Sequence, residues 1–471
     1  MHNAAARTVL ETAFSRALER VDPWQMVHDS LDVEGDCLAV RGLDRAFDLS
    51  EFKRVVLLGA GKAGAPMARA VQELLGPHIA ESLVLVKHGH RDELRGLIPG
   101  IRIVEAGHPV PDEAGLAATR ELLEMTRDCD AETLVIMLTS GGGSSLLTAP
   151  HPPLSLGDMR EMTGLLLESG ATIQEVNSVR IALSDVKGGR LAEALHPATV
   201  INLILSDVVG DRLDFIASGP CVPATIDRHD ALAVLERYRL MPRIPAAVSA
   251  LLKDPSLPPP PRAGAACFEA VHHALLGTNR LAVEAAAAAL TEAGAEALIL
   301  SSMITGEARE AARVYAGIAL DHARQAIISG PGTTSRDPHA HTSSKPLVII
   351  AGGETTVTVK GTGKGGRNQE LALALLCELE KAPRTLAERI TVLAAATDGS
   401  DGPTDAAGAW AALDVLERAR KAGFDAAGYL ANNDAWHFFA ATGDLLVTGP
   451  TNTNVCDITF ILVDRDPRAL A

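Results

Sequence analysis

The 471-residue chain is poor in aromatic residues, which make up only 3% of it. Apolar residues still account for 47%, so the core must be built mainly from Ala, Val, Leu and Ile. Such a core suits buried parallel strands covered by alanine-rich helices. The length exceeds what one ordinary hydrophobic core organises, which predicts two or three domains.

Cysteine is scarce and irregularly spaced: there are six cysteines, and no two of them form a CxxC pair. This spacing argues against a disulfide framework or a zinc site and favours a reducing compartment. No apolar run reaches membrane-spanning length. The first 20 residues mix Arg with Glu and predict an amphipathic helix instead of a secretory signal. We therefore expect a cytoplasmic protein without a membrane partner.

Positive charge is also in deficit, because 43 Lys and Arg face 59 Asp and Glu, for a net charge of −16. No long basic run is present, which argues against nucleic acid as a partner. An acidic chain that binds an anionic nucleotide must concentrate its few cations locally. Glycine-rich turns that carry basic residues are therefore the places to examine.

Apolar segments of strand length alternate with helical segments in the first half of the chain, which predicts parallel βαβ units. Ligands bind such sheets at the carboxyl ends of the strands. The expected strands cover residues 54–58, 82–86, 101–105, 133–138 and 198–205. One continuous helix is expected over residues 174–196.

A second pattern of this kind begins at Pro346. Its expected strands cover residues 346–354, 355–359, 390–397 and 457–463. Residues 329–345 are rich in Gly, Ser, Thr and His and predict an exposed loop. We expect an N-terminal domain over 1–262, a C-terminal domain over 346–471, and a connecting segment over 263–345 that fits either domain.

The turn after the first expected strand, Gly59-Ala-Gly61-Lys62-Ala-Gly64, fits the G-x-G-x-x-G pattern. Glycines let the backbone approach phosphate, and the N-terminus of the following helix offers free N–H groups. Lys62 strengthens this interpretation, since a cation there calls for an anion. A nicotinamide-binding unit would place an acid at the end of the next strand, where Lys87 stands. NAD is therefore disfavoured, whereas NADP stays open.

Two further turns follow expected strands. Residues Ser140 to Ser144 place Gly141, Gly142 and Gly143 between hydroxyls, a composition that forms a nest for phosphate or carboxylate. Asp207 follows the strand at 198–205 and is a candidate base or Mg²⁺ ligand. Asp211 is equally well explained as a ligand or as a helix N-cap.

The C-terminal half also contains a glycine-rich basic segment and acidic residues at strand ends. Residues 361–370 are glycine-rich and basic, but no Ser or Thr follows Lys364, so the segment is not a Walker A motif. Arg367 is suited to clamp a phosphoryl oxygen or a carboxylate. Asp398 and Glu354 end strands. His108 also follows a strand, although a lone histidine in a turn is more often structural.

Taken together and in order, these motifs resemble a known family. They are GAGKAG, EAGHPVPDEAG, TSGGGSSLL, LSDVVGD with IASGP, AGGET, GKGGRNQELAL, TDGSDGPTDAAGA, NND and TGPTNTNVCD. This series resembles the glycerate 2-kinases with a C-terminal MOFRL domain. The resemblance implies ATP-dependent phosphorylation of D-glycerate to 2-phosphoglycerate with Mg²⁺, in tartrate, glyoxylate or serine catabolism. It also implies a Rossmann-like parallel-sheet N-terminal domain, a smaller α/β C-terminal domain, and an active site in the cleft between them.

Lys62 and Arg367 match the family's essential lysine and arginine. With them, Asp207 and Asp398 are expected to hold Mg²⁺ or to receive the hydroxyl proton. The resemblance and the turns together assign substrate or nucleotide binding to Gly59, Gly61, Gly64, Ser140, Gly141, Gly142, Gly143, Ser144, Asp211, Glu354 and Asn368.

One departure concerns Ile181, which stands where the family is often basic. Arg180 and Lys187 are secondary candidates to compensate for it. Some relatives carry the label hydroxypyruvate reductase, so an NADP-dependent reductase is the first alternative. A non-catalytic sensor of phosphorylated metabolites is the second. A homo-oligomer is left open.

Overall fold

The computed structural model describes residues 3–91, 98–328 and 344–465, and the chain divides into two compact units. Residues Pro23–Gly277 form one unit, here called the inserted unit. The outer unit joins the described residues up to Asp22 to those from Thr278 onward. These units differ from the expected ranges: the first helix belongs with the C-terminal part, and the expected connecting segment divides at Thr278. The loop expected at 329–345 lies almost entirely outside the described residues.

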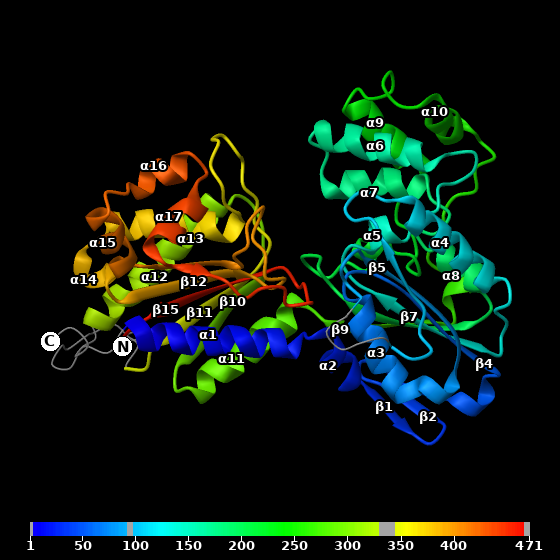
Figure 1. Cartoon of the computed structure of the whole chain (residues 1–471), viewed down its shortest axis with the longest axis horizontal. Helices are drawn as coiled ribbons and strands as arrows, with labels where there is room; N and C mark the ends of the chain where they lie inside the picture. The colour runs from blue at the N-terminus through cyan, green and yellow to red at the C-terminus, as the bar shows by residue number, and fades with distance from the viewer. Residues whose placement is uncertain (1–2, 92–97, 329–343, 466–471) are drawn as a thin grey trace. The chain divides into compact units, whose positions relative to one another are not determined.

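A parallel six-stranded sheet forms the centre of the inserted unit (Figure 1). Its strands are β4 (Arg54–Ala60), β5 (Ile79–Lys87), β6 (Ile103–Ala106), β7 (Thr133–Thr139), β8 (Thr199–Leu205) and β9 (Val271–Gly277). Their order is β6-β5-β4-β7-β8-β9, and every pairing is parallel. This is the strand order of the Rossmann fold, and it confirms the expected sheet. The order reverses between β4 and β7, and ligand sites of such sheets lie at this switch point.

Helices cover both faces of this sheet. Helix α3 (Gly64–Leu75) packs on one face, and α4 (Glu113–Thr126) and α8 (Arg190–Leu195) share a core with the other face. Three smaller antiparallel strands, β1 (Leu31–Glu34), β2 (Cys37–Val40) and β3 (Ala46–Asp48), follow helix α2 (Pro23–His28). The four-residue helix α5 (Gly143–Leu146) begins directly after the turn that follows β7.

Four helices of the inserted unit form a lobe with its own hydrophobic core (Figure 1). They are α6 (Leu156–Glu168), α7 (Ile173–Ala182), α9 (Arg228–Arg237) and α10 (Ala246–Lys253). The continuous helix expected over 174–196 is wrong, because α7 ends at Ala182 and α8 begins at Arg190. Gly188 and Gly189 lie between them with φ of 58° and 84°, a left-handed backbone that a helix does not contain.

The outer unit is built on a mixed six-stranded sheet of order β10-β11-β15-β12-β13-β14. Its strands are β10 (Glu296–Ile304), β11 (Leu347–Gly353), β12 (Ile390–Ala396), β13 (Gly408–Ala412), β14 (Leu445–Leu446) and β15 (Asp457–Val463). Helices α1 (Asn3–Arg20) and α11 (Asn279–Glu292) cover one face, and α12 (Ala308–Ile328) and α13 (Arg367–Lys381) cover the other (Figure 1). The smaller helices are α14 (Arg384–Ala387), α15 (Leu413–Lys421), α16 (Ala426–Ala431) and α17 (Ala435–Thr442).

The strand expected at 355–359 is wrong, although its β-branched residues favour one. Thr356 forms only an isolated bridge with Glu307. The backbone N–H of Thr358 donates to a carboxylate oxygen of Glu307 at 3.2 Å instead of to a neighbouring strand. Val359 is 69% exposed, so no layer covers this segment.

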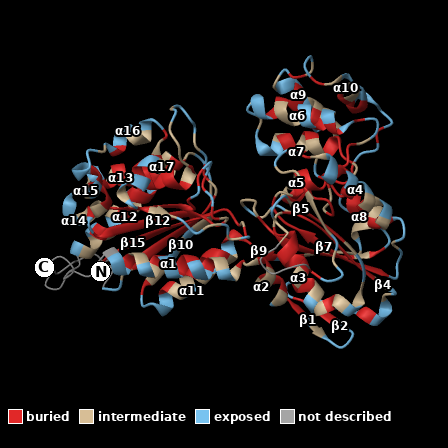
Figure 2. Cartoon of the chain, in the orientation of Figure 1, coloured by how far each residue is buried: buried red, intermediate tan, exposed pale blue. Residues whose placement is uncertain are grey.

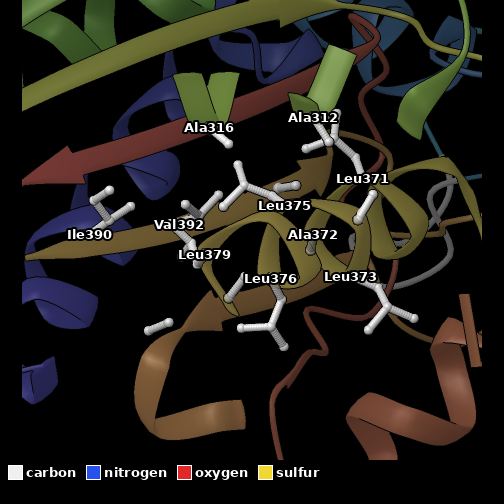
Figure 3. Packing of buried hydrophobic residues seen from close by; sticks show 14 of the residues in the cluster. Ala312, Ala316, Leu371, Ala372, Leu373, Leu375, Leu376, Leu379, Ile390 and Val392 are labelled. Atoms are coloured by element: carbon white, nitrogen blue, oxygen red, sulfur yellow. The ribbon is translucent and has the colours of Figure 1, made fainter. Parts of the chain in front are cut away.

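Small residues let the outer unit pack tightly, as the composition predicts. Figure 3 shows Leu371 and Leu375 of α13 pointing toward α12, which presents Ala312 and Ala316. The central strands of the two six-stranded sheets are buried, whereas the edge strands β6 and β10 are mostly only partly buried and the helices carry exposed outer faces (Figure 2). No helix within the described ranges is long and apolar enough to cross a membrane.

The packing of α1 in the outer unit can be tested at Leu10, which is fully buried. Leu10→Ala removes buried methyl groups and leaves a cavity, so the free energy of unfolding should fall by about 2–5 kcal/mol. Denaturant unfolding followed by tryptophan fluorescence measures the loss. The neighbouring exposed residue provides the control, since Glu11→Ala should change stability by no more than about 0.5 kcal/mol. Equal stability of the two variants would contradict the packing.

Candidate functional site

The turns that follow β4 and β7 touch each other at the switch point of the parallel sheet. A Cβ atom at Gly61 would lie 1.9 Å from the hydroxyl oxygen of Ser140, so this contact requires glycine. The backbone N–H of Lys62 donates to the carbonyl of Gly141 at 2.8 Å, and that of Ala63 donates to Ser140 Oγ at 3.2 Å. The structure therefore brings the two turns together into one surface.

Gly59 and Gly64 lie at the two ends of the first turn, which follows β4, and allow neighbouring elements to pack closely. A Cβ at Gly59 would lie 2.9 Å from Leu138 Cβ, and one at Gly64 would lie 2.9 Å from Val84 Cγ1. Gly59 therefore lets β4 approach β7, and Gly64 lets α3 approach β5. Both residues shape the turn, and Gly61 is the one at which the backbone meets the neighbouring turn.

Asp207 lies against the second turn, which follows β7. A Cβ at Gly141 would be 2.0 Å from Asp207 Oδ2, so glycine is required beside this carboxylate as well. Burial raises the pKa of Asp207, and the positive charge of Lys62 opposes that rise. A carboxyl with a raised pKa beside a lysine is suited to accept a proton.

Asp211 does not begin a helix, which removes the N-cap explanation for it. Its backbone is left-handed, with φ of 52°, and its backbone N–H donates to the carbonyl of Val208 at 3.0 Å. Burial raises the pKa of Asp211, and a hydrogen bond with Ser206 opposes the rise.

Four basic side chains of the inserted unit act through their charges on a fifth, His108: Lys62, Lys87, His90 and, from helix α7, Arg180. We call the five the cation cluster. Burial first, and then the charges of the other four, lower the pKa of His108 to about 4. Within the described ranges, Lys62, Lys87 and Arg180 form no ion pair with a carboxylate. Cations gathered in this way favour the binding of an anion. Sequence reasoning did not select His90, although it follows Lys87 in the same turn.

The second turn is tied to a strained segment. Ser144 Oγ and Ser218 Oγ share a hydrogen bond. Ala217 and Ser218 have φ of 52° and 61°, in the left-handed region that non-glycine residues seldom adopt. A Cβ at Gly143 would lie 2.7 Å from Ala217 Cβ. Strain of this kind is common at functional sites, and here it lies in the IASGP motif, for which no role was predicted.

Lys187 is buried below the second turn. Its Nζ donates to the carbonyls of Ser144 at 2.7 Å and Leu147 at 2.8 Å, and so fixes the carboxyl end of α5. Burial and the charge of Arg180 lower the pKa of Lys187 to about 7. Of the two secondary candidates, Arg180 therefore belongs to the cation cluster and Lys187 supports the turn.

Arg367 of the outer unit begins α13 and holds two carboxylates. Its Nε and Nη2 donate to Asp457 at 2.5 and 2.8 Å, and its Nη1 lies 2.9 Å from Glu354 Oε1. Burial alone would lower the pKa of Arg367, but the bond and charge of Asp457 raise it. Asp457 is 8% exposed and Glu354 is 42% exposed, so the bond to Glu354 is the more accessible of the two.

A third carboxylate, Asp401, caps α13. It accepts hydrogen bonds from the backbone N–H groups of Asn368 at 3.1 Å and Gln369 at 2.8 Å. Burial and the charge of Asp457 raise the pKa of Asp401 to about 7. The buried side-chain amide of Asn368 also donates to Asp401, at 3.3 Å, so Asn368 supports the acids that surround Arg367.

Asp398, the predicted base or metal ligand, accepts from the backbone N–H of Ser400 at 3.0 Å, and its charge contributes to the raised pKa of Asp457. The structure thus brings Glu354, Asp401 and Asp457 together around Arg367, and Asp398 acts through its charge on Asp457. Sequence reasoning missed Asp401 and Asp457, although both stand in motifs that it quoted.

The NND motif organises the glycine-rich segment before α13. Asn433 Oδ1 accepts from the N–H groups of Lys360 and Gly361 at 2.8 and 3.0 Å. Asp434 Oδ1 accepts from the N–H of Lys364 at 2.9 Å. These N–H groups are occupied, which separates this segment further from a phosphate-binding Walker A loop.

No group of three or more His, Cys, Asp or Glu side chains within the described ranges is arranged to hold a metal. A Mg²⁺ ion bound mainly through phosphate oxygens and water needs only one or two carboxylates. The roles of Asp207 and Asp398 as Mg²⁺ ligands stay predictions. The joint action of Lys62 and Arg367 stays a prediction, since each is described within its own unit.

Known proteins resemble the whole chain. Residues 9–253 match the domain of unknown function DUF4147, and residues 347–457 match the MOFRL family. A D-glycerate 2-kinase of Thermotoga maritima is 41% identical over 410 residues, covering 87% of this chain and 91% of the relative. An Agrobacterium vitis protein with the provisional name hydroxypyruvate reductase is 40% identical over 466 residues, covering 98% and 95%. A solved structure of glycerate kinase from Thermotoga maritima has a TM-score of 0.81 at 36% identity, covering 98% of this chain and 100% of that one.

The contact between Gly141 and Asp207 can be tested with Gly141→Ala. The added methyl would displace the carboxylate or the turn, so the affinity for tripolyphosphate should fall by about tenfold or more. Calorimetric titration measures this affinity. Gly164→Ala is the matched control, because a Cβ at Gly164 meets nothing within 4 Å inside α6. It should leave the affinity unchanged and add about 0.5–1 kcal/mol of stability. An unchanged affinity in Gly141→Ala would contradict the assignment.

The pKa of His108 can be measured by NMR titration, with His108→Gln assigning the signal. The ring should stay neutral until the pH falls to about 4, compared with an ordinary value of 6.5. Lys62→Met should raise this pKa, because one positive neighbour is removed. Between these pH values the unfolded chain binds a proton that the folded chain does not, so His108 makes stability fall as the pH falls. Titration near 6.5 would contradict the cation cluster.

Proposed function

The chain belongs to the glycerate kinase family with a C-terminal MOFRL domain, and on this premise we propose that it phosphorylates D-glycerate to 2-phosphoglycerate with ATP as donor. The observation that carries the proposal is the cation cluster around His108, which includes Lys62 in the turn after β4 at the switch point of the parallel sheet. Both reactants are anions, and a chain with a net charge of −16 must provide a local surplus of cations to bind them.

Phosphoryl transfer asks a protein mainly for positioning and for stabilisation of charge on the transferred group. Lys62 lies beside the contact between the two turns, where it can neutralise phosphoryl oxygens. His108 stays neutral at physiological pH and can donate or accept a hydrogen bond without adding charge. Lys87 and Arg180 supply the remaining positive charge.

Asp207 is proposed as the group that accepts the proton of the 2-hydroxyl while that oxygen bonds to the γ-phosphorus and the bond to ADP breaks. Its raised pKa makes it a stronger base than an exposed carboxylate, and the charge of Lys62 opposes that rise. The alternative role for Asp207, and for Asp398, is to hold Mg²⁺. When bound, that ion would neutralise phosphate charge.

Arg367 is proposed to bind an anionic oxygen of the substrate through Nη1. Asp457 occupies Nε and Nη2 and fixes the plane of the guanidinium. The exposed Glu354 is the partner that an incoming anion can displace. Asp457 thus acts as a positioning residue for Arg367.

NADP-dependent reduction of hydroxypyruvate is the second candidate. Two observations favour it, namely the G-x-G-x-x-G turn with Lys87 at the end of β5 and the provisional name of the Agrobacterium vitis relative. Loss of NADPH absorbance with hydroxypyruvate, in the absence of ADP formation from glycerate and ATP, would support the reductase and exclude the kinase.

Phosphorus NMR of a mixture of D-glycerate, ATP and Mg²⁺ tests the kinase and shows which hydroxyl is phosphorylated. Lys62→Ala and Arg367→Ala should each reduce turnover by about 10²–10³-fold, because each removes charge stabilisation from the transferred group. Their unfolding midpoints should change far less than their activity. Lys53→Ala and Arg313→Ala are the controls, since both residues lie in exposed ion pairs. Near-normal turnover in either Lys62→Ala or Arg367→Ala would contradict that residue's role.

A further inference from the structure

A pocket of about 170 Å³ opens in the inserted unit beside α7. One wall is formed by α7, which contributes Gln174, Asn177, Ser178 and Ile181. The facing wall comes from the segment after β8 and includes Phe215 and Ile226. None of the side chains assigned above to phosphoryl transfer lines this pocket.

The pocket adjoins the second glycine-rich turn through hydrogen bonds. Ser218 Oγ donates to Asn177 Oδ1 at 3.3 Å and also bonds to Ser144 Oγ in the turn. Asn177 lies in the pocket wall, and Arg180 of the cation cluster lies three residues further along the same helix. That spacing is about 4.5 Å along the helix axis. A ligand with phosphates on the cation cluster therefore has the pocket within reach of its other end.

The lining selects a neutral and flat group. Ile181, Phe215 and Ile226 supply apolar walls. The rim carries Arg212 and Asp214, but they neutralise each other in a two-pronged ion pair of 3.1 and 2.6 Å. The Arg212 guanidinium also lies 4.1 Å from the ring centroid of Phe215. A small anion such as glycerate finds no free cation here.

Two side-chain amides of the pocket can form hydrogen bonds with a ligand. The side-chain amide nitrogen of Asn177 has no hydrogen-bond partner among the described residues, although the residue is 6% exposed. The amide of Gln174 is exposed one turn earlier on the same helix. Amide groups of this kind pair with the ring nitrogens and exocyclic groups of a heteroaromatic base.

We propose that this pocket binds the heteroaromatic base of the nucleotide whose phosphates occupy the cation cluster. The inference rests on the proposed kinase function and adds the position of the nucleoside. It also gives Ile181 a role. This apolar side chain forms a wall for the base, whereas the basic residue often found here in the family would place a charge in the pocket.

Ser178→Phe tests the proposal by filling the pocket from a partly exposed helix position. The KM for ATP and the calorimetric Kd for ATP should each rise by about tenfold or more. The inhibition constant of tripolyphosphate, which lacks a base, and the KM for glycerate should stay within about twofold of the wild-type values. Ser249→Phe on α10 is the matched control, because it places the same side chain on the same lobe outside the pocket. It should change none of these constants.

Gln174→Ala provides a second variant at an exposed position, which removes only the amide. It should narrow the difference in KM between ATP and GTP, since a base contact is lost while the phosphates are unaffected. This variant decides the matter if Ser178→Phe does not fold.

Unchanged ATP constants in Ser178→Phe, or equal losses for ATP and tripolyphosphate, would overturn the base pocket and leave the kinase intact. The reverse outcome is distinguishable as well. If the wild-type protein transfers no phosphoryl group to glycerate but ATP binds and Ser178→Phe weakens that binding, the pocket stands and the kinase proposal fails.

Discussion

The contact between the turns that follow β4 and β7 is the constraint on which the rest of the candidate site depends. Parallel pairing brings Ala60 and Thr139 side by side at the ends of these strands, and the chains continuing from them must share one small volume. Gly61 and Gly141 make this sharing feasible, because neither tolerates a Cβ atom beside its neighbour. Lys62, Asp207 and α5 take their positions from that contact, and the link from Ser144 through Ser218 to Asn177 extends it toward the pocket.

The two units distribute charge in opposite ways. The inserted unit gathers cations, and burial among them keeps His108 neutral. The outer unit surrounds Arg367 with Glu354, Asp401 and Asp457, and burial among acids raises the pKa of Asp401 to about 7. In the first case an anion is the missing partner. In the outer unit, acids already bind Arg367, and they fix the orientation of its guanidinium.

The alternation of strands and helices predicted the parallel sheet and the glycine-rich turns at its edge, because both depend on local sequence. The break at Gly188 was missed, since surrounding residues favour a helix. Residues 355–359 have the composition of a strand, but the backbone N–H of Thr358 donates to the Glu307 side chain instead of to a neighbouring strand. Asp457 was missed because it begins a strand. Antiparallel β15 carries its first residue to the edge where β11 and β12 end, opposite Gly353 and Ala396, and that pairing is a long-range property.

The placement of α1 in the outer unit has a consequence for synthesis of the chain. Helix α1 is translated before the inserted unit, and its packing partner α11 is translated after it. At ordinary ribosomal rates the intervening segment takes on the order of tens of seconds to make. During this interval the inserted unit can fold with its sequence complete, while the apolar face of α1, including Leu10, has no native surface to cover it. Completion of the outer unit therefore waits for β15, which is translated after the whole inserted unit.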